Sequence, residues 1–150
     1  MQYRSYRASD QARILKIFES NCPKYFDPND KKYLIEFLEN WTNEDYLVVI
    51  NNGNIIGCGG HYVKEDRFGI AWVMFERESI GHRHLLNTSD QFYGKIEDNI
   101  RKENLVLPIK VNTTQLMEKL FNRYGFKTYE IIENGFGDGL DEYKMSKTLY

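Results

Sequence analysis

The chain of 150 residues has 20 basic and 22 acidic residues, giving a formal net charge of −2. This balance argues against non-specific nucleic-acid binding, which requires a basic face to neutralise phosphates. No apolar stretch approaches the roughly 18 residues of a membrane span, and the first residues lack the apolar segment of a signal peptide. The two cysteines fit neither a disulfide framework nor a CxxC site, so we expect a cytoplasmic protein with no membrane association.

The first part of the chain is expected to form an edge strand and two helices. Residues 2–8 alternate as a strand does, and Ser9 or Asp10 caps the helix that follows. Pro23 and Pro28 mark a loop before a second helix over 30–41. Helical spacing predicts that this second helix turns one face to the core, formed by Tyr33, Leu34, Phe37, Leu38 and Trp41.

Residues 45–76 predict three antiparallel strands in succession. Two apolar runs flank Asn52 and Gly53, a pair favoured in tight hairpin turns because both residues accept positive φ. The segment 65–69 makes a second turn into the third apolar run. Cys58 lies in a buried run between glycines and is expected in the core.

The remainder predicts a helix, a strand, a helix and a final hairpin. The helix over 81–102 should bury Leu85, Leu86, Phe92, Ile96 and Ile100. A strand follows over 105–112, in which Pro108 suggests that one side lacks a ladder partner. A helix over 113–124 ends at Gly125, and residues 126–149 form two strands around a glycine-rich connection. The sequence therefore predicts one α+β domain over residues 1–150, with a mixed sheet and helices packed on it.

The start of the helix at residue 81 poses a question of charge. His82, Arg83 and His84 stand where aligned backbone amides already favour anions, so basic side chains there cost stability unless an anion binds. One reading is an anion site, and the other is a solvated charged face. The three histidines do not suggest a metal site, because His82 and His84 diverge on a helix.

The order of elements and two motifs resemble the GNAT-type N-acetyltransferase superfamily. The motifs are WVMFERESIGHRHLL, over residues 72–86, and LFNRYGF, over residues 120–126. The resemblance covers nearly the whole chain and implies a GNAT-like fold, with a mostly antiparallel sheet of about seven strands flanked by about four helices. It also implies acetyl-CoA as co-substrate, without a metal.

The resemblance implies a set of cofactor-binding residues. The strand beside the pantetheine arm would contribute Val73, Met74 and Phe75, with a backbone amide near Val73 or Met74 for the carbonyl oxygen. The diphosphate would bind the helix start, formed by Gly81, His82, Arg83, His84 and Leu85. Asn112 and Phe121 complete the set. The chain departs from the family pattern at four places: Glu78 stands at the usual glutamine or arginine, Arg83 at the second glycine or alanine, Thr114 at the usual asparagine, and Phe121 at the common tyrosine.

Amide formation requires a base for the amine, and an acid assists the leaving thiolate. Phe121 cannot donate a proton, so Tyr124, three residues on, is the candidate acid, with packing at the helix end as the alternative. The candidate bases are Asp66, in the turn after the second strand of the meander, and His61 on that strand. Glu65 and Glu76 are further options. Each has an ordinary structural alternative, as a turn residue, a hydrogen-bonded strand histidine or a solvated carboxylate.

The resulting hypothesis is an N-acetyltransferase that acetylates a primary amine of a small molecule or peptide by direct attack. The degenerate glycine motif and Phe121 leave open a non-catalytic acyl-CoA sensor of the same fold. A protein-interaction domain with exposed aromatic residues is the third option. An exposed terminal strand also makes a homodimer a possibility.

Overall fold

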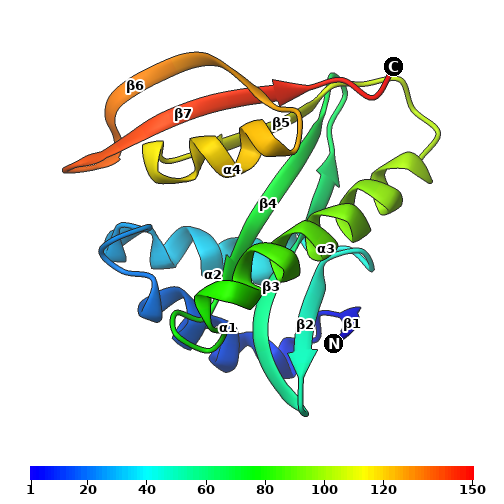
Figure 1. The fold of residues 1–150 in the computed structure, drawn as a ribbon. Coiled ribbons are helices and arrows are strands. Elements are labelled where there is room, and N and C mark those ends of the chain that lie inside the picture. Colours follow the sequence, from blue (N-terminus) through cyan, green and yellow to red (C-terminus); the bar gives the residue numbers. More distant parts are fainter.

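The computed structural model describes residues 1–150, apart from the side chains of His82 and Arg83. It is a seven-stranded sheet with four α-helices (Figure 1). The strands are β1 Gln2–Ser5, β2 Leu47–Asn51, β3 Asn54–Val63, β4 Phe68–Phe75, β5 Ile109–Thr113, β6 Lys127–Gly137 and β7 Leu140–Lys147. The helices are α1 Gln11–Ser20, α2 Lys31–Asn40, α3 His82–Arg101 and α4 Glu118–Arg123, and three short 3₁₀ segments cover Ala8–Asp10, Pro28–Asp30 and Gln115–Met117.

The sheet is mixed, with strand order β1-β2-β3-β4-β5-β7-β6. Neighbouring strands are antiparallel except β4 and β5, which run parallel. The predicted fold class and element order are confirmed. β6 forms one edge of the sheet, and dimerisation through that edge stays a prediction.

The two parallel strands are paired over a very short distance. Phe68 pairs with Ile109 and Gly69 with Lys110, and the pairing ends there. Beyond Gly69, β4 keeps its partner β3 but separates from β5, as the ribbon shows (Figure 1). The sheet is therefore split into two halves that are joined near Phe68 and open toward Phe75. Pro108 stands just before β5, where its missing N–H costs no ladder bond.

Each face of the sheet has its own core. One core lies under α1 and α2 and is built from Ile14, Ile17, Phe18, Leu34, Leu38, Tyr46, Val48, Cys58, Ala71 and Met74. The other lies under α3 and α4, where Phe92, Ile96, Ile100, Phe121 and Phe126 meet apolar residues of β2 to β5 and β7. Full burial of such side chains stabilises the fold by about 1.5–3 kcal/mol each. The amphipathic patterns of α1 and of the middle of α3 are confirmed, as is the core position of Cys58.

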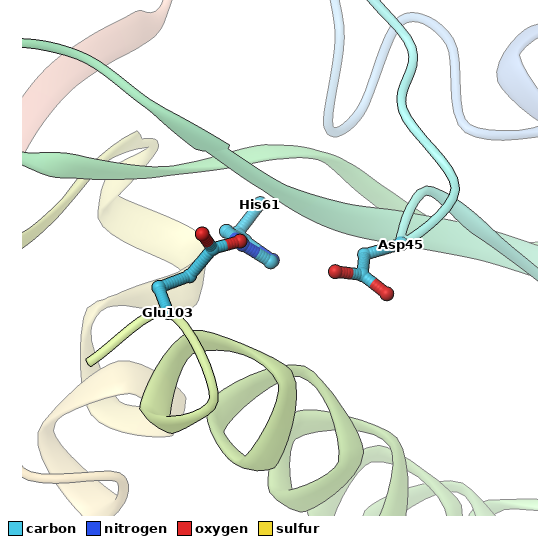
Figure 2. Close-up of side chains that lie close together, drawn as sticks. All are labelled: Asp45, His61 and Glu103. Atoms are coloured by element: carbon cyan, nitrogen blue, oxygen red, sulfur yellow. The ribbon is translucent and has the colours of Figure 1, made fainter. Parts of the chain in front are cut away.

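A polar contact joins the end of α3 to the sheet. The side chain of His61, on β3, is fully buried, and its Nε2 lies 3.1 Å from Oε1 of Glu103, just after α3. Figure 2 shows these two side chains together with Asp45, which precedes β2.

Several predicted core positions were wrong. Tyr33 and Trp41 are 55% and 65% exposed, and Leu85 and Leu86 are 37% and 45% exposed. Spacing identifies side chains that share a helix face but not how far the neighbouring sheet extends. The helix predicted over 113–124 is also shorter, because its first part is the 3₁₀ segment Gln115–Met117. None of the described helices is long and apolar enough to cross a membrane.

Candidate active site

A β-bulge shapes β4 where it leaves β5. Cys58 pairs with Met74 and Gly60 with Ala71, so Trp72 and Val73 together face the single residue Gly59. Trp72 has φ +41°, a conformation that costs a non-glycine residue about 1–3 kcal/mol and is often found at functional sites. A Cβ at Gly59 would lie 2.7 Å from Cγ2 of Val73, so the strand opposite the bulge requires glycine.

The orientation of the bulge is set by a buried tyrosine. The Tyr46 hydroxyl donates a 3.0 Å hydrogen bond to the carbonyl oxygen of Trp72, and Sγ of Cys58 lies 3.6 Å from the same oxygen. Burial, with Cys58 as a further cause, raises the pKa of Tyr46 well above its usual value, so the phenol stays a donor. In a trans peptide the N–H points opposite to the C=O. Because the Trp72 carbonyl points toward the Tyr46 hydroxyl, the Val73 N–H of the same peptide points away from that hydroxyl.

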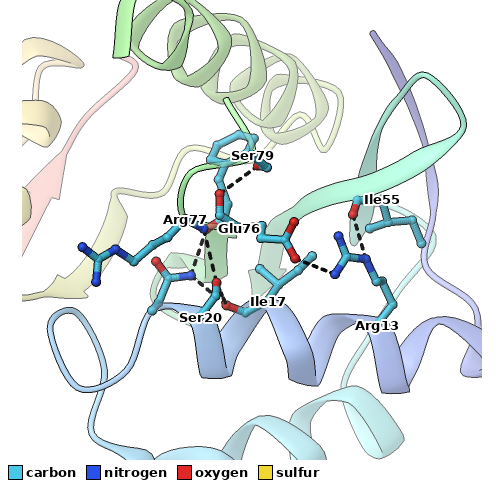
Figure 3. Close-up of polar contacts among 9 residues, drawn as sticks. Arg13, Ile17, Ser20, Ile55, Glu76, Arg77 and Ser79 are labelled. Atoms are coloured by element: carbon cyan, nitrogen blue, oxygen red, sulfur yellow. Dashed lines mark hydrogen bonds and ion pairs between the residues drawn. The ribbon is translucent and has the colours of Figure 1, made fainter. Parts of the chain in front are cut away.

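The loop after β4 is fastened to α1 (Figure 3). The Asn21 side-chain amide donates to the carbonyl of Phe75 at 2.8 Å, and the Arg77 N–H donates to Ser20 Oγ at 3.2 Å. Arg13 donates to Glu76 at 2.6 Å and to the Ile55 carbonyl at 3.0 Å. The hydrogen bond from Arg13 lowers the pKa of Glu76, so this carboxylate is charged and engaged. These bonds fix the approach of the chain to α3.

The helix α3 begins without a side-chain cap. Gly81 is the N-cap residue, and its carbonyl accepts from the N–H groups of His84 and Leu85 at 2.9 and 3.1 Å. The first amides of a helix have no intrahelical acceptor, and glycine has no side chain to satisfy them. A helix end of this kind favours anions, and it follows the open end of β4. His84 and Leu85 are exposed, whereas the side chains of His82 and Arg83, both predicted ligands, lie outside the described residues.

The other predicted cofactor residues differ in accessibility. On β4, Val73 and Phe75 are partly buried and Met74 is 4% exposed, so Met74 can offer its backbone but little of its side chain. On β5, Asn112 is exposed. Phe121 is buried in the core, where its ring centroid lies 5.4 Å from that of Phe126.

Tyr124 lies between α3 and α4. Its ring stacks on Tyr93 with centroids 4.4 Å apart and planes 2° apart, and Lys147 Nζ donates to its carbonyl at 2.6 Å. The Tyr124 hydroxyl oxygen is buried and has no hydrogen-bond partner among the described residues. Burial and then Asp90 raise the pKa of Tyr124, so the phenol keeps its proton at neutral pH.

The candidate acid and bases are not brought together. His61 pairs with Ile70 and contacts Glu103 at the end of α3, and Asp66 lies in the turn before Phe68, 70% exposed and paired with Arg67. Both therefore lie toward the end of β4 that is still paired with β5, whereas Gly81 follows the open end. The roles of His61 and Asp66 as bases stay predictions.

Two features of this site were not predicted from the sequence. The bulge at Trp72 depends on a register shift between strands, although three glycines within residues 57–60 were a signal of close backbone approach. Thr114, which follows β5, is 5% exposed and its Oγ1 has no partner among the described residues. From the sequence, Thr114 was noted as a departure from a family pattern and not as a buried hydroxyl.

The split sheet, the bulge and the uncapped helix start together define a fold of the GNAT N-acetyltransferase type, and solved structures confirm it. No protein-family model and no curated protein matches the sequence. The ribosomal-protein-S18-alanine N-acetyltransferase from Escherichia coli matches with a TM-score of 0.77 and 13% identity, over 99% of this chain and 93% of that one. The aminoglycoside 6′-N-acetyltransferase from Enterococcus faecium matches with a TM-score of 0.72 and 12% identity, over 100% and 98%.

A third similar structure carries ligands. Rv2747 from Mycobacterium tuberculosis, in complex with CoA and NLQ, matches with a TM-score of 0.70 and 18% identity over 100% of both chains. At these identities the likeness establishes the fold and leaves the reaction and the acceptor to be argued from the residues.

Proposed function

We propose that this protein is an acetyl-CoA-dependent N-acetyltransferase that acetylates a primary amine. The observation that carries the proposal is the position of two features at the same open end of β4. One is the bulge at Trp72 and Val73, where β4 has separated from β5, and the other is the start of α3 at Gly81, which has no side-chain cap. The thioester carbonyl oxygen needs a single N–H donor, and the diphosphate needs a group of N–H donors such as a helix start provides.

The diphosphate of the donor would bind the backbone amides at the start of α3, ahead of those of His84 and Leu85, which already donate to the Gly81 carbonyl. A helix N-terminus supplies several N–H groups and a partial positive charge, and α3 is 20 residues long. The polar bonds from Asn21, Ser20 and Arg13 hold the preceding loop in place, so little ordering would be needed on binding. Several similar structures contain coenzyme A, which supports this choice of donor.

The pantetheine arm would lie along the exposed edge of β4, with the backbone of Val73, Met74 and Phe75 as partners. Asn112 lies on β5 across the gap, and Thr114, beyond the end of β5, has a buried hydroxyl with no partner among the described residues. Phe121 would act through the core rather than by direct contact, since it is packed among Phe126 and Tyr124.

In the reaction the amine nitrogen attacks the thioester carbon, the C–S bond breaks, and the products are the N-acetylated amine and the CoA thiol. The Val73 N–H would stabilise the negative charge that develops on the carbonyl oxygen. In other acyl-transfer enzymes, removing one such donor lowers kcat by about 10²–10³-fold. Tyr124 would protonate the thiolate, supported by its hydroxyl, which has no hydrogen-bond partner among the described residues. The amine loses a proton to a base, for which Asp66 and His61 stay candidates.

The acceptor is a small-molecule or peptide amine. Similar folds include an enzyme that acts on aminoglycosides and one that acts on an alanine of a ribosomal protein, so the fold accommodates both classes. We propose no metal in this reaction.

The test has two parts. Calorimetric titration with CoA should show binding, and a mixed panel of small amines and peptides should release free CoA thiol from acetyl-CoA. Binding without release would establish the sensor alternative, which the core position of Phe121 at the family's tyrosine place favours. Absence of CoA binding at millimolar concentration would refute both.

A further inference from the structure

We propose that Asp45, His61 and Glu103 form a binding site for a divalent transition-metal ion, with Zn²⁺ as the best match. The three residues come from the segment before β2, from β3 and from the segment after α3 (Figure 2). One potential ligand atom from each lies within 4.8 Å of the other two. The proposal does not depend on the proposed acetyl transfer, but a metal bound to His61 would leave Asp66 as the candidate base for that reaction.

The charges of the cluster favour a cation. Asp45 and Glu103 bring two carboxylates to one imidazole, and among the side chains that the structure describes neither makes an ion pair with lysine or arginine. In contrast, Asp10, Glu76 and Asp90 each pair with an arginine. Converging carboxylates repel each other, and a divalent ion between them removes that repulsion.

The burial and contacts of the His61 ring are compatible with a metal ligand. Its side chain is 0% exposed, and Nε2 faces Glu103 at 3.1 Å, while Nδ1 is buried with no partner among the described residues. No second hydrogen bond therefore fixes the tautomer. Nε2 is the ring atom that faces Glu103, so it is the nitrogen that an ion beside Glu103 would meet.

The backbone around the cluster is already organised. The side-chain amide of Asn43 donates to the carbonyl of His61 at 3.1 Å, and Oδ1 of Asn43 accepts from the N–H of Asp45 at 2.8 Å. One asparagine thus ties the segment that carries Asp45 to the strand that carries His61. Small side-chain rotations of Asp45 and Glu103 would bring the ligand atoms to about 2.0–2.2 Å from a common ion.

The ligand types in the cluster limit which metal ions would bind. One imidazole nitrogen and two carboxylate oxygens suit Zn²⁺ and similar transition ions better than Ca²⁺ or Mg²⁺, which prefer oxygen-only sets. The Glu103 side chain is 35% exposed and Asp45 is partly exposed, so water can complete the coordination and the ion can exchange. A bound ion would fasten the end of α3 to β3, at the opposite end of that helix from Gly81.

The experiment uses the full chain after treatment with a chelator. Zn²⁺ should raise the melting temperature of the wild-type protein, and competition with a chromogenic chelator gives the affinity. Asp45→Asn and Glu103→Gln should each lower that affinity at least about tenfold, because a charged ligand is lost. Glu44→Gln, an exposed neighbour of Asp45, is the matched control and should bind like the wild type.

A second measurement identifies the nitrogen ligand. Co²⁺ should give the wild-type protein visible absorption bands of a low-symmetry site with imidazole, and Zn²⁺ should abolish them. Asp45→Asn and Glu103→Gln replace a carboxylate with an amide of nearly the same shape, so these variants should fold even if a variant of the buried His61 does not. Equal Zn²⁺ affinity in the wild type, Asp45→Asn and Glu103→Gln, or no Zn²⁺ binding by the wild type at 100 µM, would overturn the proposal.

Discussion

The hydroxyl of Tyr46 lies 3.0 Å from the carbonyl oxygen of Trp72, although 26 residues separate them. Tyr46 is 1% exposed and belongs to the core under α1 and α2, whereas Trp72 forms the bulge at the split of the sheet. The bond therefore links the packing of one core to the direction of the Val73 N–H. The peptide N–H that we propose as the donor to the thioester oxygen is therefore positioned by a side chain of the opposite core.

Tyr46→Phe removes this bond and keeps the ring. We expect a loss of about 1–3 kcal/mol in the free energy of unfolding, because the Trp72 carbonyl loses its hydroxyl donor. We also expect kcat to fall about tenfold with little change in CoA affinity, since the peptide that presents Val73 becomes freer to rotate. Urea unfolding and thiol-release kinetics measure the two effects.

Tyr6→Phe is the matched control for Tyr46→Phe. The Tyr6 ring packs edge-on against Tyr46 with centroids 6.0 Å apart, and its substitution leaves the bond to Trp72 in place. It should leave kcat within about twofold of the wild type. An equal loss of kcat in both variants would show that general packing, rather than the bulge, controls turnover.

Gly81→Asp tests the anion site at the start of α3. A Cβ at Gly81 meets no atom within 4 Å and the residue has φ −62°, so aspartate fits without strain. Its carboxylate would cap the free amides and raise the free energy of unfolding by about 1 kcal/mol. The same carboxylate would occupy the diphosphate position and repel it, so CoA affinity should fall at least about tenfold.

Gly81→Ala separates these two effects because it adds a Cβ without a capping group. CoA affinity should stay within about twofold in this variant. Thermal melts of both variants measure the change in stability, and calorimetric titration measures the change in CoA affinity. If Gly81→Asp binds CoA as the wild type does, the diphosphate does not lie at this helix start.

Local pattern predicted most of the fold, because strands, turns and helices here follow from neighbouring residues. Asn52 and Gly53 are an example, since the hairpin they predict is present between β2 and β3. The exposure of Leu85, Leu86 and Trp41 was not predictable, because it depends on where a distant sheet ends.

The site was predicted less completely than the fold. Gly81 as a helix start and the strand at Val73 were visible in the sequence, because a glycine before an apolar helix is a local signal. The Trp72 bulge arises from pairing with residues more than ten positions away, and the position of Tyr124 against Tyr93 depends on how α3 packs on α4. Neither relationship has a signature in a single stretch of sequence.

Tyr124→Phe tests the proposed acid. The hydroxyl has no hydrogen-bond partner among the described residues, so its removal should change the melting temperature by less than about 2 °C. Turnover should fall by about 10²-fold or more with CoA affinity unchanged, as expected for loss of a general acid. Tyr93→Phe, in the same stacked pair, removes a hydroxyl that donates to Glu97 at 2.9 Å, so it should lower the melting temperature more than Tyr124→Phe and lower turnover less. Unchanged turnover in Tyr124→Phe would assign protonation of the thiolate to another group or to water.

Acid should loosen the loop between β4 and α3 through Glu76. The hydrogen bond from Arg13 holds the pKa of Glu76 below its unfolded value, so the pair stabilises the folded state at neutral pH. Because the folded pKa is the lower one, this contribution is complete above the unfolded pKa of about 4.3 and disappears as the pH falls through the folded value. Glu76→Gln should therefore lower the free energy of unfolding by about 0.5–1 kcal/mol at pH 7, as expected for a partly exposed ion pair, and by almost nothing near pH 3. Urea unfolding at the two pH values measures this difference, and Glu78→Gln, an exposed carboxylate two residues on, should show neither effect. A loss that is the same at both pH values would mean that Glu76 stabilises the loop by packing and not by its charge.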